Sequence, residues 1–281
     1  MRQRALSAAL FVPPLLLVVA LGEPWFAALI AVFVVIASVE MAGLLKAAGY
    51  KAVSWLLAAG ALATALDLAA PMSSPVAPGP WPYGSLLIAC VVVATGIAGF
   101  RETDTKAGFS VWISTAFGAL CVGLLGCLVR LGEAGPALAA SAPVTQLGAT
   151  RGWILLLILI VWSYDTGAYI VGIALGKKKF LSHISPSKSY WGLFGGVAAA
   201  TAVTVGGLWA LGQPPVMGLV AGPLLGLVAQ GGDLAESMLK RAAGKKDSGS
   251  LIPGHGGILD RVDSFLFAAP VAALLVTTFV R

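Results

Sequence analysis

The chain has 281 residues, of which 58% are hydrophobic and only 11% charged, and its formal net charge is +6. Together with a mean hydropathy of +0.93, this composition excludes an ordinary soluble domain and indicates a protein that lies largely in lipid. The positive charge is too small and dispersed to indicate nucleic-acid binding, and basic residues beside membrane spans orient a protein and attract lipid head groups.

Apolar runs of about 18 to 25 residues recur along the chain, and a helix of about 20 residues crosses the hydrocarbon core of a bilayer. We therefore expect an all-α, polytopic membrane protein with about nine transmembrane helices. In chain order, the expected spans are residues 5–22, 24–45, 52–70, 83–99, 107–130, 152–175, 193–212, 215–232 and 263–280. A cleaved signal peptide is the alternative for the first run, but no clear small-residue cleavage site precedes Glu23 and Pro24, which favours a span.

The basic residues predict the orientation of these spans. If the N-terminus is cytoplasmic, 15 of the 18 lysines and arginines fall in inner segments, and only Arg130, Arg151 and Arg281 fall outside. Short cytoplasmic loops of membrane proteins carry an excess of Lys and Arg. A cytoplasmic N-terminus is therefore expected.

The sequence shows no separate soluble part and no internal repeat. We expect residues 1–281 to form a single membrane domain, in which residues 1–150 are mainly scaffold spans and residues 151–281 carry the catalytic spans and cytoplasmic loops. Residues 71–82 and 134–150 are rich in Pro, Gly and Ala and are expected to be outer connecting loops.

Four acidic residues lie within expected spans, namely Glu40, Asp67 and Asp165, and Asp263 at the first position of the last span. A charged side chain near the bilayer centre costs about 2.5–3.5 kcal/mol on insertion scales, so such a residue usually faces a protein interior, a wet cavity or a cation. Asp165 is the clearest functional candidate, and a hydrogen bond to a neighbouring helix is the structural alternative. For Glu40 and Asp67 the functional and structural interpretations are left open.

The inner loop at residues 176–192 combines basic and hydroxyl side chains. Ser185, Lys188 and Ser189 are candidate contacts for a phosphate group. The lysine triplet at residues 177–179 is explained by orientation of the protein in the membrane.

Residues 231–264 form a polar, basic and glycine-rich segment between two apolar runs. Helical spacing places two sets of its side chains on one helix face each. These sets are Asp233, Glu236, Ser237 and Lys240, and Asp260, Asp263 and Ser264. If the two faces meet, several carboxylates surround one point beside cationic side chains, which is the arrangement expected for Mg²⁺ holding a nucleotide triphosphate.

Between these two sets lies a glycine-rich stretch that includes His255, Gly256 and Gly257. Its backbone is able to approach phosphate oxygens and to present amide hydrogens to them. Such a stretch alone is more often a turn, and the acids and cations on both sides favour the phosphate interpretation. A positive-inside anchor explains part of the charge of the preceding cations, which are Lys240, Arg241, Lys245 and Lys246.

Together these residues resemble the signature of the phosphatidate cytidylyltransferases, also called CDP-diacylglycerol synthases. That signature runs Ser-x-apolar-Lys-Arg, four residues, Lys-Asp, a small residue, an apolar-Pro pair, His-Gly-Gly, Asp-Arg and a final Asp. It is filled here by Ser237, Leu239, Lys240, Arg241, Lys246, Asp247, Gly249, Ile252, Pro253, His255, Gly256, Gly257, Ile258, Asp260, Arg261, Val262 and Asp263. Residues 165–169 and 232–237 are also similar to the family, and the multispan organisation agrees over essentially the whole chain.

One position departs from the family pattern. The family loop usually reads Ser-Pro-Lys-Lys-Thr-Trp-Glu-Gly, and Trp191 stands here in place of the Glu. This replacement puts in doubt a metal or base role for that position.

The resemblance implies that CTP and phosphatidate react to give CDP-diacylglycerol and pyrophosphate, by metal-assisted attack of the lipid phosphate on the α-phosphorus of CTP. It places the enzyme in the inner membrane of the cell with its active site facing the cytoplasm. It also implies Mg²⁺, a monovalent cation such as K⁺, a homodimer, and no nucleic-acid partner.

Under this resemblance, each candidate residue receives a role. The catalytic residues would be Asp233, Asp260, Lys240, Arg261 and Asp263. The substrate-binding residues would be Ser185, Lys188, Ser189, Ser237, Arg241, Lys246, Asp247, His255, Gly256 and Gly257. The metal ligands would be Asp233 and Asp260, with Asp165 as a further candidate.

Two alternative functions stay open. A CTP-dependent lipid kinase would transfer the γ-phosphate to a lipid alcohol, and its products would be a phosphorylated lipid and CDP. An ion-coupled membrane transporter would use buried acids to carry protons or cations. The transporter accounts for Asp165 and Glu40 but not for the crowded segment at residues 231–264.

Overall fold

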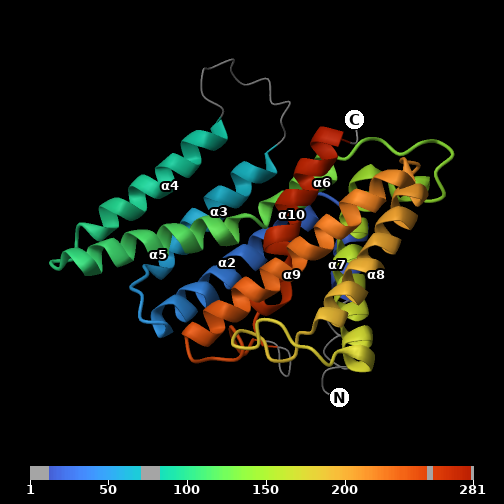
Figure 1. Cartoon of the computed structure of the whole chain (residues 1–281). Helices are drawn as coiled ribbons and strands as arrows, with labels where there is room; N and C mark the ends of the chain where they lie inside the picture. Colours follow the sequence, from blue (N-terminus) through green and yellow to red (C-terminus); the bar gives the residue numbers. More distant parts are fainter. Residues whose placement is uncertain (1–12, 71–82, 252–255, 280–281) are drawn as a thin grey trace. The chain divides into compact units, whose positions relative to one another are not determined.

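The computed structural model of the chain describes residues 13–70, 83–251 and 256–279 (Figure 1). Within these ranges it consists of α-helices and two short 3-10 helices, without a β-strand. Residues 13–21 are helical. The further helices are α2 (Trp25–Ala47), α3 (Ser54–Ala69), α4 (Tyr83–Gly99), α5 (Thr105–Gly123), α6 (Gly126–Ala134), η1 (Thr145–Leu147), α7 (Ala149–Leu175), α8 (Tyr190–Ala210), η2 (Pro215–Met217), α9 (Gly218–Ala242) and α10 (Leu259–Phe279).

Six stretches of helix are long and apolar enough to cross a membrane, and α5 with α6 counts as one of them. Two shorter apolar helices, Ser54–Ala69 and Leu87–Gly99, coincide with two more of the expected spans. The predicted all-α membrane protein is thereby confirmed, with about nine spans as an approximate count. Residues 5–12 of the first expected span and the expected loop at residues 71–82 lie outside the described residues.

Two helices extend beyond the apolar runs that predicted them. Helix α9 continues ten residues past the expected end at residue 232, and α10 begins four residues before residue 263. Hydropathy marks where a helix leaves the lipid and not where its hydrogen bonds end. The polar residues of the segment at 231–264 are therefore largely on helices.

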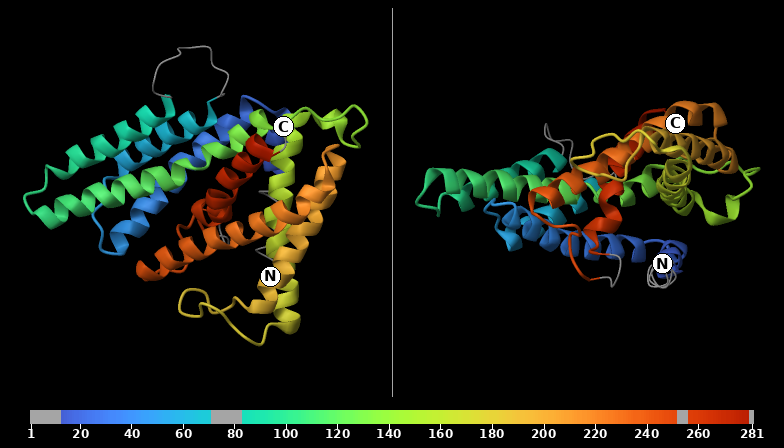
Figure 2. Two further views of the ribbon diagram at one scale, coloured as in Figure 1. Left: turned by 45° about the horizontal axis from the view of Figure 1, so that its top comes forward. Right: turned by 60° about the horizontal axis from the view of Figure 1, so that its bottom comes forward.

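Contacts divide the chain into two compact units. The first unit comprises the described parts of Met1–Arg130 together with Leu239–Val262, and the second comprises Leu131–Met238 together with Asp263–Arg281. In the first unit, α3 packs against α2, α4 and α5, which Figure 2 shows as the blue to green helices. The predicted division of labour between residues 1–150 and 151–281 stays a prediction.

In the second unit, α7 and α8 pack along each other with their backbones in contact. A Cβ atom added to Gly167 would lie 2.7 Å from the carbonyl oxygen of Gly195, and one added to Gly195 would lie 2.9 Å from that of Gly167. Small residues allow membrane helices to approach this closely. The pairing of α7 with α8 thus depends on two facing glycines.

Gly195→Ala is expected to destabilise the protein by about 1–3 kcal/mol, because its methyl group has no room between the two helices. Its matched control is Gly206→Ala on the same helix, where an added Cβ meets nothing within 4 Å. The control is expected to be neutral or slightly stabilising, because alanine favours helix. Melting temperatures in detergent check both, and equal values for the two variants would contradict the close backbone contact.

Candidate functional site

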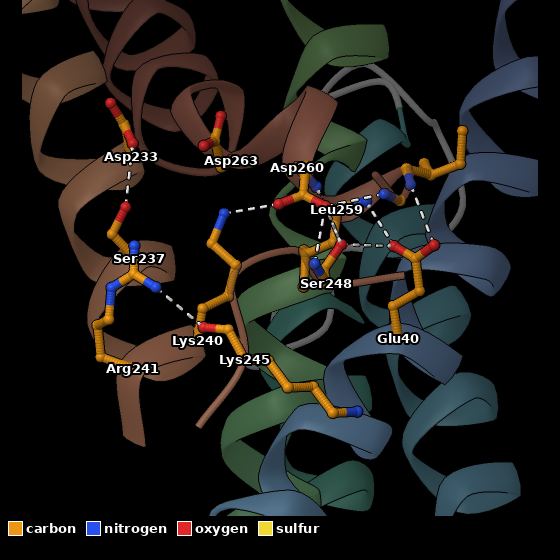
Figure 3. Close-up of polar contacts among 12 residues, drawn as sticks. Glu40, Asp233, Ser237, Lys240, Arg241, Lys245, Ser248, Leu259, Asp260 and Asp263 are labelled. Atoms are coloured by element: carbon orange, nitrogen blue, oxygen red, sulfur yellow. Dashed lines mark hydrogen bonds and ion pairs between the residues drawn. The ribbon is translucent and has the colours of Figure 1, made fainter. Parts of the chain in front are cut away.

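The polar cluster of the first unit is built around Asp260, which lies in the first turn of α10 (Figure 3). One carboxylate oxygen, Oδ1, accepts a hydrogen bond of 2.6 Å from Lys240 Nζ. The other, Oδ2, accepts from the Ser248 amide at 2.8 Å, the Ser248 hydroxyl at 2.7 Å and the Gly257 amide at 2.8 Å. The ion pair is buried, with side-chain exposures of 11% for Lys240 and 5% for Asp260. A buried ion pair needs such additional hydrogen bonds to offset desolvation.

Glu40 of α2 belongs to the same cluster. Its carboxylate accepts from the Ile258 amide at 3.1 Å and the Leu259 amide at 2.7 Å, and Oε2 lies 3.1 Å from the Ser248 hydroxyl, which donates either to Glu40 or to Asp260. The first amides of a helix lack partners within that helix, and a carboxylate beside them is also favoured by the helix dipole. Glu40 therefore caps α10 from a position 218 residues before Ile258 in the chain.

The glycines of the signature make room for these two carboxylates. Gly256 has φ of +80° and an added Cβ would lie 2.5 Å from Asp260 Oδ2, while one added to Gly257 would lie 2.3 Å from Glu40 Oε2. The Gly257 amide donates to Asp260 and is not presented to a ligand. The predicted approach of this backbone to phosphate thus stays a prediction, and His255 lies outside the described residues.

The remaining charged signature residues of the first unit lie at its surface. Arg241 donates from Nη1 to the Lys245 carbonyl at 3.1 Å and so closes the turn after α9. Lys246, Asp247 and Arg261 are exposed. The exposed cations Lys246 and Arg261 are accessible to an anionic ligand from the solvent.

The polar cluster of the second unit is built around Asp233 on α9. Lys188 forms an ion pair with Asp233 Oδ2, and the Ser237 hydroxyl donates to Oδ1 at 3.3 Å. Both members of the ion pair are partly exposed, at 21% for Lys188 and 23% for Asp233. The pair is therefore open to exchange with a ligand, unlike the pair in the first unit.

The loop before α8 holds Lys188 in place. Ser189 is buried and is the N-cap of α8, where its hydroxyl accepts from the Gly192 amide at 3.1 Å. This bond gives Ser189 a structural role, and its phosphate contact, like that of the half-buried Ser185, stays a prediction. Trp191, which replaces the family's Glu, is 52% exposed and its ring lies 6.3 Å from that of Phe194.

Asp263 lies beside Asp233 because α9 and α10 touch at this level (Figure 3). A Cβ atom added to Gly232 would lie 2.4 Å from the Asp263 carbonyl oxygen, so the two backbones are in contact. Asp263 Oδ1 accepts from the Ser264 amide at 2.6 Å. The close approach at Gly232 places Asp263 against the residue that precedes Asp233, although the two acids are 30 positions apart in the sequence.

Asp165, the third predicted metal ligand, lies on α7 of the second unit and is exposed. Its neighbour Tyr164 is buried at 1% exposure and donates its hydroxyl hydrogen to Gln230 Oε1 at 3.0 Å. This bond connects α7 to α9 three residues before Asp233. A ligand role for Asp165 stays a prediction.

The acidic residues of the second unit offer the oxygen ligands that Mg²⁺ prefers, and binding of that ion stays a prediction. Among the described residues, no three His, Cys, Asp or Glu side chains form a group able to hold a metal ion. Mg²⁺ in nucleotide-using sites, however, is commonly held by one or two carboxylates and completed by water and phosphate oxygens. Asp233 and Asp263 match that set, whereas the oxygens of Asp260 already accept four hydrogen bonds.

Comparison with known proteins gives a match over nearly the whole chain. Residues 2–279 match the model of a family described as the cytidylyltransferase family. The chain is 52% identical over 113 residues to the phosphatidate cytidylyltransferase of Synechocystis sp., covering 40% of this chain and 38% of that protein. It is 45% identical over 136 residues to the phosphatidate cytidylyltransferase of Bacillus subtilis, covering 48% and 50%. That of Pseudomonas aeruginosa is 38% identical over 154 residues, covering 54% and 55%. The chain thus spans about half the length of these curated relatives or less.

Proposed function

This chain belongs to the cytidylyltransferase family, and from that premise we propose that it is a phosphatidate cytidylyltransferase, converting CTP and phosphatidate to CDP-diacylglycerol and pyrophosphate. The observation that carries the proposal is the family match over residues 2–279, and the buried ion pair of Asp260 with Lys240 and the ion pair of Asp233 with Lys188 lie within the matched region. The relatives named phosphatidate cytidylyltransferase support the choice of substrates.

The proposed reaction needs alignment more than it needs a base. An oxygen of the lipid phosphate forms a bond to the α-phosphorus of CTP, and the bond from that phosphorus to the β-phosphate bridging oxygen breaks, so pyrophosphate leaves with the electron pair. The attacking oxygen is already anionic at neutral pH. The tasks of the protein are therefore positioning and neutralisation of charge.

In the first unit, we assign Lys240 and Asp260 the task of fixing the end of α9 against the start of α10. The exposed Lys246 and Arg261 and the neighbouring Arg241 would neutralise substrate phosphates, and Arg suits phosphate because its guanidinium donates in pairs. Asp247 and the His255-Gly256-Gly257 stretch keep their proposed role in substrate binding. That role rests on the resemblance.

In the second unit, Asp233 and Asp263 would hold Mg²⁺, with Ser237 beside them. The bound ion would neutralise the charge of the departing pyrophosphate. Lys188 already neutralises Asp233, so it is placed to exchange between that carboxylate and a phosphate group. Asp260 and Asp165 as metal ligands, a K⁺ ion and a homodimer belong to the proposal on the resemblance alone.

Product analysis tests the function. The purified protein is incubated with Mg²⁺, phosphatidate and CTP labelled at either the α- or the γ-phosphate. We expect the α-label in the lipid and the γ-label in pyrophosphate, with turnover lost in EDTA and restored by Mg²⁺. A γ-labelled lipid would instead identify a lipid kinase, and the absence of nucleotide turnover with cation flux in liposomes would identify a transporter.

We also propose that the active site faces the cytoplasm across the inner membrane. The predicted orientation places every lysine of the chain on the inner side, because the three outer basic residues are all arginines. An impermeant amine reagent applied to sealed right-side-out vesicles is therefore expected to modify no lysine, and to modify several once the vesicles are opened. Modification of Lys246 in sealed vesicles would reverse the orientation.

A further inference from the structure

We infer that Glu40 is a positioning residue for the junction that leads into α10, meaning Ser248 together with residues 256–260. Its kinetic consequence rests on the proposed function, whereas its structural consequence does not. Glu40 lies on α2, far from the signature in the sequence, and neither the signature nor the relatives' names assign it a role.

Both oxygens of Glu40 are committed to this junction. Oε1 accepts from the Ile258 amide, Oε2 accepts from the Leu259 amide, and the Ser248 hydroxyl oxygen lies within hydrogen-bond distance of Oε2. Added Cβ atoms at Gly249 and Gly257 would lie 2.6 Å and 2.3 Å from the Glu40 carboxylate. The chain therefore wraps closely around this one side chain on two sides.

Ser248 couples Glu40 to Asp260. Its hydroxyl oxygen lies 3.1 Å from Glu40 Oε2 and 2.7 Å from Asp260 Oδ2. A hydroxyl carries one hydrogen, so it donates to one of the two carboxylates at a time. The Gly257 amide holds Asp260 while the next two amides hold Glu40. A shift at Glu40 is thereby passed to Asp260 and to its partner Lys240.

An ordinary helix cap would add stability without affecting turnover by the folded protein. Glu40 differs from such a cap because the same hydroxyl and the same short backbone segment also hold a signature carboxylate. Misplacement of a catalytic group by about 1 Å can cost about a hundredfold in rate. Loss of Glu40 is therefore expected to lower turnover by correctly folded protein.

The first measurement is amide hydrogen exchange on the full chain in detergent, comparing Glu40→Gln with the parent. Glutamine keeps the size but offers one acceptor oxygen in place of two. Exchange of the amides at residues 256–260 is expected to be about tenfold faster, because hydrogen bonds to the first amides of α10 are lost. The matched control is Ser38→Ala, also on α2, whose buried hydroxyl donates only to its own helix at Val34. The control is expected to leave these amides unchanged.

The second measurement is a double-mutant cycle on kcat/KM for CTP. Glu40→Gln and Ser248→Ala are each expected to lower kcat/KM by about 10- to 100-fold, and the double variant is expected to be no worse than the worse single variant. Ser38→Ala is expected to match the parent. A purely structural role would lower the yield of folded protein and leave kcat/KM per folded molecule unchanged.

The outcomes separate the inference from the proposed function. If the parent forms no CDP-lipid while Glu40→Gln accelerates exchange at residues 256–260, the proposed function fails and the contact role of Glu40 stands. Unchanged exchange in Glu40→Gln would overturn the inference whatever the parent's activity. Fully additive effects in the cycle, or unchanged kcat/KM in Glu40→Gln, would overturn the kinetic part.

Discussion

Asp260→Asn is expected to lower CTP-dependent formation of CDP-lipid by about 10² to 10³-fold while the protein still inserts into the membrane. Asparagine offers one acceptor oxygen where Asp260 uses two, and it removes the negative charge from the buried ion pair with Lys240. Removing one partner of a buried ion pair costs about 3–5 kcal/mol of folding stability, and a displacement of neighbouring catalytic groups by about 1 Å can cost about a hundredfold in rate. The rate of labelled lipid formation per folded molecule measures this loss.

The matched control for this variant is Glu102→Gln in the same unit. It breaks the ion pair of Glu102 with Lys51, which has the same separation of 2.6 Å but is exposed, at 55% for Lys51 and 32% for Glu102. Exposed pairs contribute about 0–1 kcal/mol, so turnover is expected to stay within about fivefold of the parent. Near-normal turnover in Asp260→Asn would remove Asp260 from the active site.

Asp233→Asn is expected to raise the Mg²⁺ concentration needed for half-maximal turnover and to lower the maximal rate by at least about a hundredfold. The reason is that a neutral amide replaces one of the two carboxylates, Asp233 and Asp263, that we propose as ligands. The same change leaves Lys188 without its counter-charge. A magnesium titration of the turnover rate separates the metal effect from a general loss of activity.

Two further variants serve as controls for the magnesium titration of Asp233→Asn. Asp104→Asn should leave the curve unchanged, because Asp104 is the N-cap of α5, bonded to the Ala107 amide at 2.8 Å, and asparagine caps equally well. Lys188→Ala is expected to raise KM for a phosphorylated substrate without the same loss of Mg²⁺ affinity. An Asp233→Asn titration that superimposes on the parent curve would exclude Asp233 as a ligand.

Local patterns predict most of the helices and some contacts within them. The apolar runs identify the spans because a helix in lipid must be apolar over about 20 residues. The i, i+4 spacing of Asp233 and Ser237 predicts that they face each other, and the structure gives a hydrogen bond of 3.3 Å between them. The position of Ser189 before an apolar run is also typical of an N-cap, and in the structure its hydroxyl accepts from the Gly192 amide.

The partners of the charged residues could not be predicted in this way. Lys188 meets Asp233 across 45 positions, and Lys240 meets Asp260 across 20. The sequence does not distinguish a functional role of Glu40 from a structural one. The three groups within hydrogen-bond distance of its carboxylate belong to a segment more than 200 positions later in the chain. The sequence shows that Glu40 is an acidic residue within a span, but this position does not identify the groups that its carboxylate contacts.

Hydropathy and spacing are local properties, so they are enough to predict a helical membrane protein whose polar residues concentrate in a signature segment. Which carboxylate each lysine, hydroxyl and amide contacts is known from the folded chain alone. These pairings depend on which helix faces pack together. Close packing at Gly232, against Asp263, and at Gly257, against Glu40, brings residues that are remote in the chain into contact.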